Sequence, residues 1–196
     1  MPGNDRLSFG FSLHRPVFDM SEKVTSVKLR KMIFIALMIS AAIVLSIIES
    51  TISAAFFIIP GVKLGLANII TLVILYVYGA KDAVIVVFLR IFLVSLIYSG
   101  LFTPPSLLSF SGGVFAVLTM ILIKQSHRFS IIGVSVAGSL MHMVGQILMA
   151  MVVLETTALV YYLPYMLLLS VPAGIVTGLV SRKLTQEYKK QIEREI

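Results

Sequence analysis

Six polar or charged side chains lie within otherwise apolar stretches, and together they have the chemistry to bind a small solute. They are Glu49, Lys63, Asn68, Arg90, His142 and Gln146. Lysine and arginine attract an anionic group, whereas asparagine, histidine and glutamine supply hydrogen bonds that orient it. Ionisable residues inside apolar helices are costly and usually face an internal cavity. We therefore predict a non-covalent binding site for an anionic ligand.

The stretches around these residues have the composition of membrane helices. The chain has 196 residues, of which 58% are hydrophobic and 13% charged, and its mean hydropathy is +1.01. Because soluble domains are about 25% charged, this composition excludes an ordinary soluble domain. One crossing of a bilayer needs about 20 residues of helix. Charges and turn residues divide the chain into six helices, which we predict at 29–49, 63–79, 82–99, 105–124, 130–153 and 164–183.

The basic residues are distributed unevenly over this arrangement. If both termini lie in the cytoplasm, every lysine and arginine except Lys63 and Arg90 falls on the cytoplasmic side. Such an excess is what membrane insertion selects for. The net charge of +7 is then explained by topology, which removes the argument for nucleic-acid binding. The prediction is an all-α integral membrane protein with six transmembrane helices and both termini cytoplasmic.

Composition also divides the chain into three parts. Residues 1–27 show no sustained apolar periodicity and are predicted to be a flexible cytoplasmic N-terminal extension. Residues 28–184 form the six-helix membrane domain, and residues 185–196 form a cytoplasmic tail that carries both basic and acidic residues. The first apolar run is longer than the ~7–15 residues of a signal-peptide core, so it is interpreted as a membrane anchor.

Depth in the membrane places the six polar residues together. At 1.5 Å per helical residue, Arg90 lies near mid-membrane, and Lys63, Asn68 and Gln146 belong to the middle or outer half. Their common depth predicts a single outward-facing pocket. Alternatives remain open: Arg90 can bond a carbonyl, His142 and Gln146 can serve only to hold helices together, and Lys63 can pair with Glu49.

Two further surfaces suggest roles outside the pocket. The loop over residues 51–60 is more apolar than a water-facing loop needs to be, which predicts a lid around Phe56 and Phe57. The alternative is an aromatic belt at the membrane surface. Small residues on the first helix, including Ala36 and Ser40, allow close packing and form a candidate docking face for a partner membrane protein.

A resemblance to a known family emerges from longer motifs. The segments that carry it are Pro60–Tyr76 (PGVKLGLANIITLVILY), 79–83, Arg90, 111–113 (SGG), 138–142 (GSLMH) and 145–146 (GQ). Over residues 29–184 they resemble the bacterial membrane family known as heptaprenyl diphosphate synthase component I, or Gx transporter. Relatives often have asparagine where this chain has Met143.

This family is in turn similar to the S-components of energy-coupling factor (ECF) transporters. The resemblance implies a six-helix bundle with an outer pocket, a lid after the first helix, and a small-residue face on that helix. That face would include Ala36 and Ser40, where Ser40 departs from the usual alanine. The implied partners are an ECF coupling membrane protein and ATPase subunits, and the implied location is the bacterial cytoplasmic (inner) membrane, as a multi-pass protein.

The sequence argues against enzymatic activity. Prenyl-chain elongation needs Mg²⁺ held by clustered carboxylates, but the only aspartates are Asp5, Asp19 and Asp82, which are far apart. There is no P-loop pattern and no cysteine. We therefore expect a non-enzymatic protein without a metal or cofactor.

Three functions follow in order of preference. The first is a substrate-binding subunit for uptake of a small anionic micronutrient or an isoprenoid- or quinone-related precursor, powered by a partner ATPase module. The second is a non-catalytic membrane accessory subunit of a prenyl diphosphate synthase or a quinone-related system. The third is a stand-alone channel or secondary transporter, which would usually need a longer chain or internal repeats.

Overall fold

The structure is a computed structural model that describes residues 17–56, 63–126 and 128–195. Side chains within the helices are described except at 17–24, 26, 27, 54–56 and 195. The described chain is helical and contains no strand. Its elements are α1 (Val17–Phe56), α2 (Asn68–Val77), α3 (Ala80–Val94), the π-helical turn η1 (Ser95–Ser99), α4 (Pro104–Gln125), α5 (Ile131–Val153), the 3₁₀ helix η2 (Thr157–Tyr162) and α6 (Leu163–Glu195).

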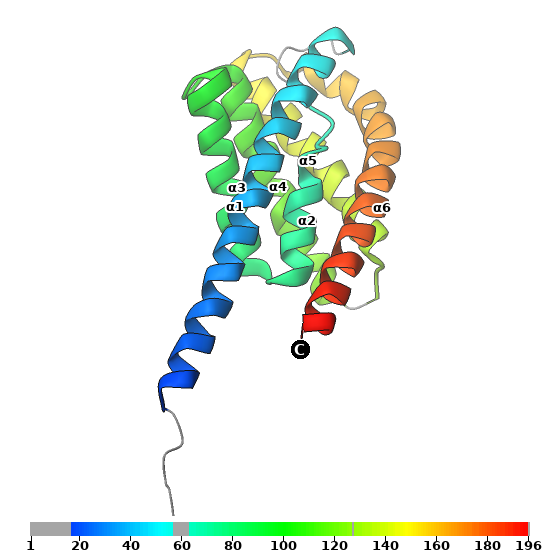
Figure 1. The fold of residues 1–196 in the computed structure, drawn as a ribbon. Helices are drawn as coiled ribbons and strands as arrows, with labels where there is room; N and C mark the ends of the chain where they lie inside the picture. Colours follow the sequence, from blue (N-terminus) through cyan, green and yellow to red (C-terminus); the bar gives the residue numbers. More distant parts are fainter. Residues whose placement is uncertain (1–16, 57–62, 127, 196) are drawn as a thin grey trace, which may run out of the picture. The chain divides into compact units, whose positions relative to one another are not determined.

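The chain divides into two units, residues 1–34 and residues 35–196. Within the second unit, α5 packs along α4 on one side and along α6 on the other (Figure 1). Helix α2 is in contact with α3, α4, α5 and α6, so it is the central helix of this unit. Every residue from Asn68 to Leu75 is buried, as expected for a helix that is apolar around its whole circumference.

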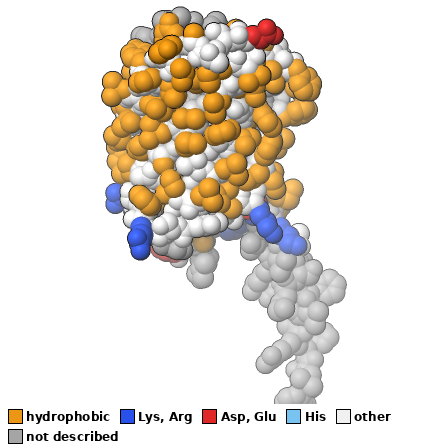
Figure 2. Space-filling view, turned by 180° about the vertical axis from the view of Figure 1, so that it is seen from behind, with side chains coloured by type: hydrophobic (Ala, Val, Ile, Leu, Met, Phe, Trp, Pro, Cys, Tyr) orange, Lys and Arg blue, Asp and Glu red, His pale blue; other side chains and the backbone are white. Residues whose placement is uncertain are grey.

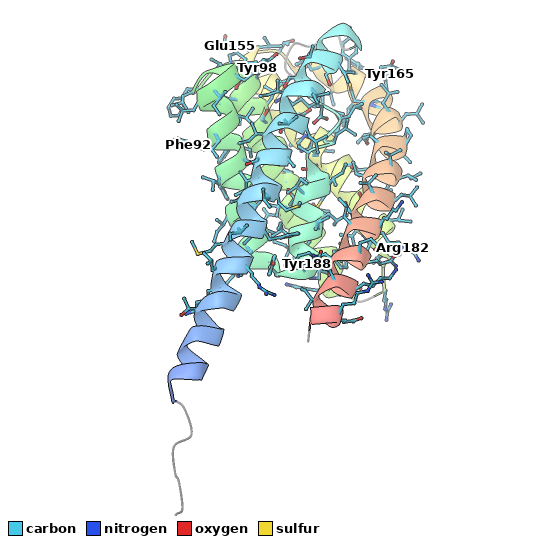
Figure 3. All side chains as sticks on the ribbon, viewed as in Figure 1. Phe92, Tyr98, Glu155, Tyr165, Arg182 and Tyr188 are labelled. Atoms are coloured by element: carbon cyan, nitrogen blue, oxygen red, sulfur yellow. The ribbon has the colours of Figure 1, made fainter. Side chains whose placement is uncertain are left out.

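The lengths and composition of the helices identify a multi-pass membrane protein. Four described segments are long and apolar enough to cross a bilayer: Lys28–Ser53, Pro104–Gln125, Ile131–Val153 and Thr157–Arg194. Apolar side chains cover the middle of the face in Figure 2, with basic side chains at one end. Figure 3 shows Arg182 and Tyr188 near one end of the second unit, and Tyr98, Glu155 and Tyr165 near the opposite end.

The prediction of a helix from residue 63 is wrong at its start. Helix α2 begins at Asn68, and residues 63–67 are not helical. Its 10 residues extend about 15 Å, half the thickness of a bilayer core. Gly65 has a φ of +89°, a conformation that interrupts the helix and that glycine adopts without strain. Lys63 therefore does not open a helix.

The other helices follow the predicted order, but α1 and α6 are longer than predicted, and α1 ends at Phe56, so residues 51–56 of the predicted loop are helical. Helix α1 begins at Val17, inside the stretch assigned to the N-terminal extension, and α6 continues to Glu195, through the stretch assigned to the tail. The predicted turn between the third and fourth helices is confirmed. Gly100 there has a φ of +82°, and α4 begins at Pro104, where proline suits the first turn of a helix.

The close packing of α6 on α5 leads to the first testable prediction. A Cβ atom on Gly174 would lie 2.7 Å from the backbone Cα of Val136, which cannot move aside as a flexible side chain can. We expect Gly174→Ala to lower the free energy of unfolding by about 1–3 kcal/mol, the usual cost of overpacking. The measurement is the apparent melting temperature in detergent.

Gly133→Ala is the matched control for this substitution. Gly133 lies on α5, and its added Cβ would meet Phe129 at an ordinary 3.6 Å. Because alanine favours a helix by up to about 1 kcal/mol over glycine, this variant should melt at the same or a higher temperature. Equal melting temperatures for both variants would contradict the close approach of α5 and α6.

Candidate functional site

A small polar cavity lies among α1, the segment 63–67, α2, α3, α4 and α5. Five of the six predicted site residues line it: Glu49, Lys63, Asn68, Arg90 and His142. The sixth, Gln146, is linked to it through a hydrogen bond to His142. About 20 Å³ is open to the centre of a water molecule, which is room for one or two waters. The cavity is therefore closed to anything larger in this conformation.

The non-helical segment 63–67 is held by two of the predicted site residues. Backbone groups at membrane depth must be hydrogen-bonded within the protein, because no water is available there. The amide N–H groups of Gly65 and Leu66 both donate to Glu49 Oε1, the latter at 3.0 Å. The amide N–H of Lys63 donates to Gln146 Oε1 at 3.0 Å. Glu49 and Gln146 thus stabilise this irregular backbone, a role that the sequence did not indicate.

Gly65 allows this segment to pass close to α5. Besides its positive φ, a Cβ atom at this position would lie 2.8 Å from Asn68 Nδ2 and 3.2 Å from His142 Cδ2. Any other residue would push two cavity side chains away. The glycine in the Lys63-Leu-Gly-Leu-Ala-Asn68 run is therefore required both by backbone conformation and by the space around it.

The two ends of the short helix α2 lie in different electrostatic surroundings. Its N-terminus, where the helix dipole is positive, begins at Asn68 beside the cavity. At its other end Lys124 Nζ donates to the carbonyl of Leu75 at 2.5 Å and lies 4.9 Å from the centre of the Tyr76 ring. Lys124 thereby places a positive charge at the negative end of the helix dipole.

The hydrogen bonds of Gln146 determine the proton position on His142. Because Gln146 Oε1 accepts from the amide of Lys63, its Nε2 is the group that meets His142 Nε2, at 3.0 Å. An amide nitrogen only donates, so His142 Nε2 accepts and an uncharged His142 carries its proton on Nδ1. In the described part of the chain, Nδ1 has no hydrogen-bond partner. It is a free donor.

Other buried cavity atoms also lack partners among the described residues. They are Arg90 Nη1 and both side-chain polar atoms of Asn68. Arg90 and Asn68 are 4% and 1% exposed, so bulk water does not satisfy them. Leaving such a group unsatisfied costs about 1–3 kcal/mol. The described residues also include no ion pair between Glu49 and either Lys63 or Arg90, although all three line the cavity.

The cavity therefore offers mainly hydrogen-bond donors. Arg90, His142 and Asn68 each present one or more N–H groups, and Lys63 adds an ammonium group to the lining. The acceptor Glu49 Oε1 already receives two backbone N–H groups. Two basic side chains face one acidic side chain. Such a site is complementary to a ligand group that is anionic and rich in acceptors.

The sequence analysis missed three serines that line the cavity: Ser46, Ser95 and Ser109. Serine is common in tightly packed membrane helices, so its presence alone does not indicate a site. A usable signal existed on α1, where the buried residues Ile39, Ala42, Ser46, Glu49 and Ser53 recur every three or four positions. That spacing puts Ser46 and Ser53 on the same helix face as Glu49.

None of the described residues that line the polar cavity is a predicted lid or docking residue. Phe56 is the last residue of α1, but its side chain is not described, and Phe57 lies outside the described residues. Ala36 and Ser40 are exposed on α1. The Ser40 hydroxyl donates to the carbonyl of Ala36 at 3.0 Å, which is a bond within the helix. The lid and the docking face stay predictions.

The segment that contains the cavity matches a known protein family. Residues 38–184 match the family model described as heptaprenyl diphosphate synthase component I. This range covers three quarters of the chain and includes every residue that lines the cavity. No match was found among curated proteins or among solved structures.

Proposed function

Since the chain belongs to the heptaprenyl diphosphate synthase component I family, we propose that it is a non-enzymatic binding subunit that captures a small anionic solute for uptake. The observation that carries the proposal is the set of buried, unpartnered donors on Arg90 and Asn68 around one cavity, with the His142 Nδ1–H facing Gly112 beside them. Of the eight buried side-chain atoms without a partner among the described residues, four belong to these three residues, and the other four are single hydroxyls that do not line the cavity. Buried polar atoms normally find a partner, so a cluster of them suggests a ligand or water. Lys63 and Arg90 supply the charge that attracts the anion.

In the proposed topology all six helices belong to the membrane domain and both termini are cytoplasmic, in the bacterial cytoplasmic membrane. The end of the second unit that carries Arg182 would face the cytoplasm, and the end that carries Glu155 would face outward (Figure 3). This orientation agrees with the excess of basic residues on cytoplasmic segments of membrane proteins. The short helix α2 would start near mid-membrane and present its positive end to the ligand.

Capture of a solute requires the cavity to widen, and α1 is the element best suited to move. The backbone of α1 does not pack closely against any other described helix. Its buried face reaches the segment 63–67 through the carboxylate of Glu49. Displacing α1 would therefore break few close backbone contacts, and its main cost would be the hydrogen bonds that Glu49 accepts from Gly65 and Leu66. The exposed Ala36 and Ser40 face would remain available for an ECF coupling protein that acts with ATPase subunits.

A second candidate is favoured by the family's description as a synthase component. In that case the protein is a non-catalytic membrane accessory subunit of a prenyl diphosphate synthase. Catalysis by this chain alone is not proposed, because Asp5, Asp19 and Asp82 are too far apart in sequence to form an aspartate-rich Mg²⁺ motif. The two candidates differ in the proteins with which the subunit associates.

Purification from native membranes in a mild detergent tests the proposal. Mass spectrometry of the purified complex should identify a coupling membrane protein, ATPase subunits and a bound anionic molecule. The molecule should be lost from Arg90→Met and retained by Ser135→Ala. Ser135 is a suitable control because its hydroxyl bonds to Thr177 at 2.7 Å, away from the cavity, and Thr177 keeps a bond to Gly174 when that partner is removed.

Two results of this purification would contradict uptake. Isolation with a soluble prenyl synthase and without any ATPase would instead support the accessory role. Equal retention of the anionic molecule by Arg90→Met and Ser135→Ala would show that the ligand binds outside the polar cavity.

A further inference from the structure

A second and larger hollow lies on the surface between α3 and α4. Its volume is about 800 Å³, and its lining is apolar apart from two serines. Phe88 of α3 and Phe110 of α4 both line it and contact each other edge to face, with ring centroids 5.6 Å apart. Phe92, labelled in Figure 3, is 51% exposed at its rim. We call this hollow the α3–α4 groove.

The α3–α4 groove and the polar cavity share two lining residues, Ile91 and Ser95. These residues are four apart on the continuous helix formed by α3 and η1, so they lie on one face of it, and Ile91 directly follows Arg90. Ser95 is the first residue of the π-helical turn η1, and π-helical turns occur frequently at functional sites. On α4, Ser106 lines the groove, and Ser109, one turn later, lines the cavity. A thin wall of side chains thus separates the two spaces.

The two spaces have opposite chemistry. On one side of Ile91 and Ser95 are Lys63, Arg90 and the donors of the polar cavity. On the other side is an apolar surface that is open to the hydrocarbon of the membrane. A molecule that satisfies both spaces has an anionic head joined directly to an apolar chain. Because a wall of side chains separates the two spaces, such a molecule would have to pass between them at the two shared residues, Ile91 and Ser95.

We propose that the ligand is a single-chain anionic amphiphile, with its head in the polar cavity and its hydrocarbon tail in the α3–α4 groove. The chain would pass between the two spaces at Ile91 and Ser95, and the ligand would enter sideways from the membrane. This inference rests on the proposed binding function and names its substrate class. For a probe added from water, the tail leaves water when it enters the groove, so the measured affinity should rise with tail length.

The test uses three probes that share a head and differ in the tail: inorganic diphosphate, isopentenyl diphosphate and farnesyl diphosphate. Leu107→Trp adds bulk inside the groove, whereas Leu118→Trp makes the same change at an exposed position of α4 outside both hollows. Because the chain has no tryptophan, each variant also carries a single fluorescent reporter. Binding is measured by native mass spectrometry and fluorescence in detergent.

We expect wild type and Leu118→Trp to bind farnesyl diphosphate at least about tenfold more tightly than isopentenyl diphosphate, a difference of about 1.4 kcal/mol. Leu107→Trp should lose this preference and keep its affinity for the short probe. Val84→Phe, which narrows the groove from α3, should behave in the same way. It replaces Leu107→Trp in the comparison if that variant fails to fold. Arg90→Met should lose all three probes.

Several results would overturn the proposal. A wild-type affinity that does not depend on tail length would show that the tail does not bind in the groove. If Arg90→Met still lost the probes in that case, the proposed binding function would stand. Unchanged preference in both groove-filling variants would place the tail elsewhere. Displacement of farnesyl diphosphate by phosphatidylglycerol vesicles would make the groove a general lipid site. Failure of every probe to bind would exclude this ligand class, and the ligand isolated from native membranes would then test the proposed function independently.

Discussion

Replacing Glu49 by alanine is expected to destabilise the protein more than any other single change in the cavity. Glu49 is 2% exposed, and its Oε1 accepts the amide N–H groups of Gly65 and Leu66. Each buried amide left without a partner costs about 1–3 kcal/mol, so Glu49→Ala should lower the free energy of unfolding by roughly 2–6 kcal/mol. The apparent melting temperature in detergent measures this loss.

Two variants show whether the hydrogen bonds are responsible. Glu49→Gln keeps an oxygen in the same place, so it should lose only the part of the stability that depends on the charge of the acceptor. Glu155→Ala removes an exposed carboxylate and should change the free energy of unfolding by no more than about 0.5 kcal/mol. If Glu49→Ala had the same melting temperature as Glu155→Ala, the conformation of the segment 63–67 would not depend on Glu49.

Arg90→Met is expected to raise stability while it removes ligand binding. Arg90 is 4% exposed, and its Nη1 has no partner among the described residues. Burying a charge that has no paired opposite charge costs several kcal/mol, and an apolar side chain of similar volume removes that cost. The ligand-free Arg90→Met protein should therefore melt at a higher temperature than wild type. Its affinity for the isolated anionic ligand should fall at least about a hundredfold, equivalent to roughly 2.7 kcal/mol.

Lys124→Met provides the control of opposite sign. Like Arg90, Lys124 is a basic residue on an apolar helix. Unlike the Nη1 atom of Arg90, its Nζ has partners among the described residues, because it donates to the carbonyl of Leu75 and lies over the ring of Tyr76. Removing these contacts should lower the melting temperature and leave ligand affinity unchanged, because Lys124 does not line the cavity. A ligand-free Arg90→Met protein that melts below wild type would show that Arg90 has a structural partner, and the case for a binding role would then fail.

These two predictions describe different uses of polar groups in one membrane site. Glu49 and Gln146 are occupied by backbone amides, so they maintain the shape of the cavity. Arg90, His142 and Asn68 keep unpartnered atoms, so they remain available to a ligand. A site that binds strongly when loaded is expected to contain groups that are unfavourable when it is empty.

Sequence alone determined the class of the protein and much of its candidate site. Hydropathy identified a membrane protein because burial in lipid requires long apolar runs. Removing the basic residues that topology explains left Lys63 and Arg90, and both line the cavity. The order of the helices and the turn at Gly100 were also predictable, since glycine and proline mark such turns locally.

Only the tertiary structure separated the structural residues from the free ones. Whether Glu49 or Asn68 has a partner depends on where the backbone of the segment 63–67 runs, and that path depends on contacts between residues far apart in sequence. The same reasoning explains why the start of α2 was mispredicted: an apolar sequence favours a helix, but the positive φ of Gly65 and two amides bonded to Glu49 interrupt it. The groove beside the cavity was likewise invisible in the sequence, because its lining comes from two helices whose separation only packing decides.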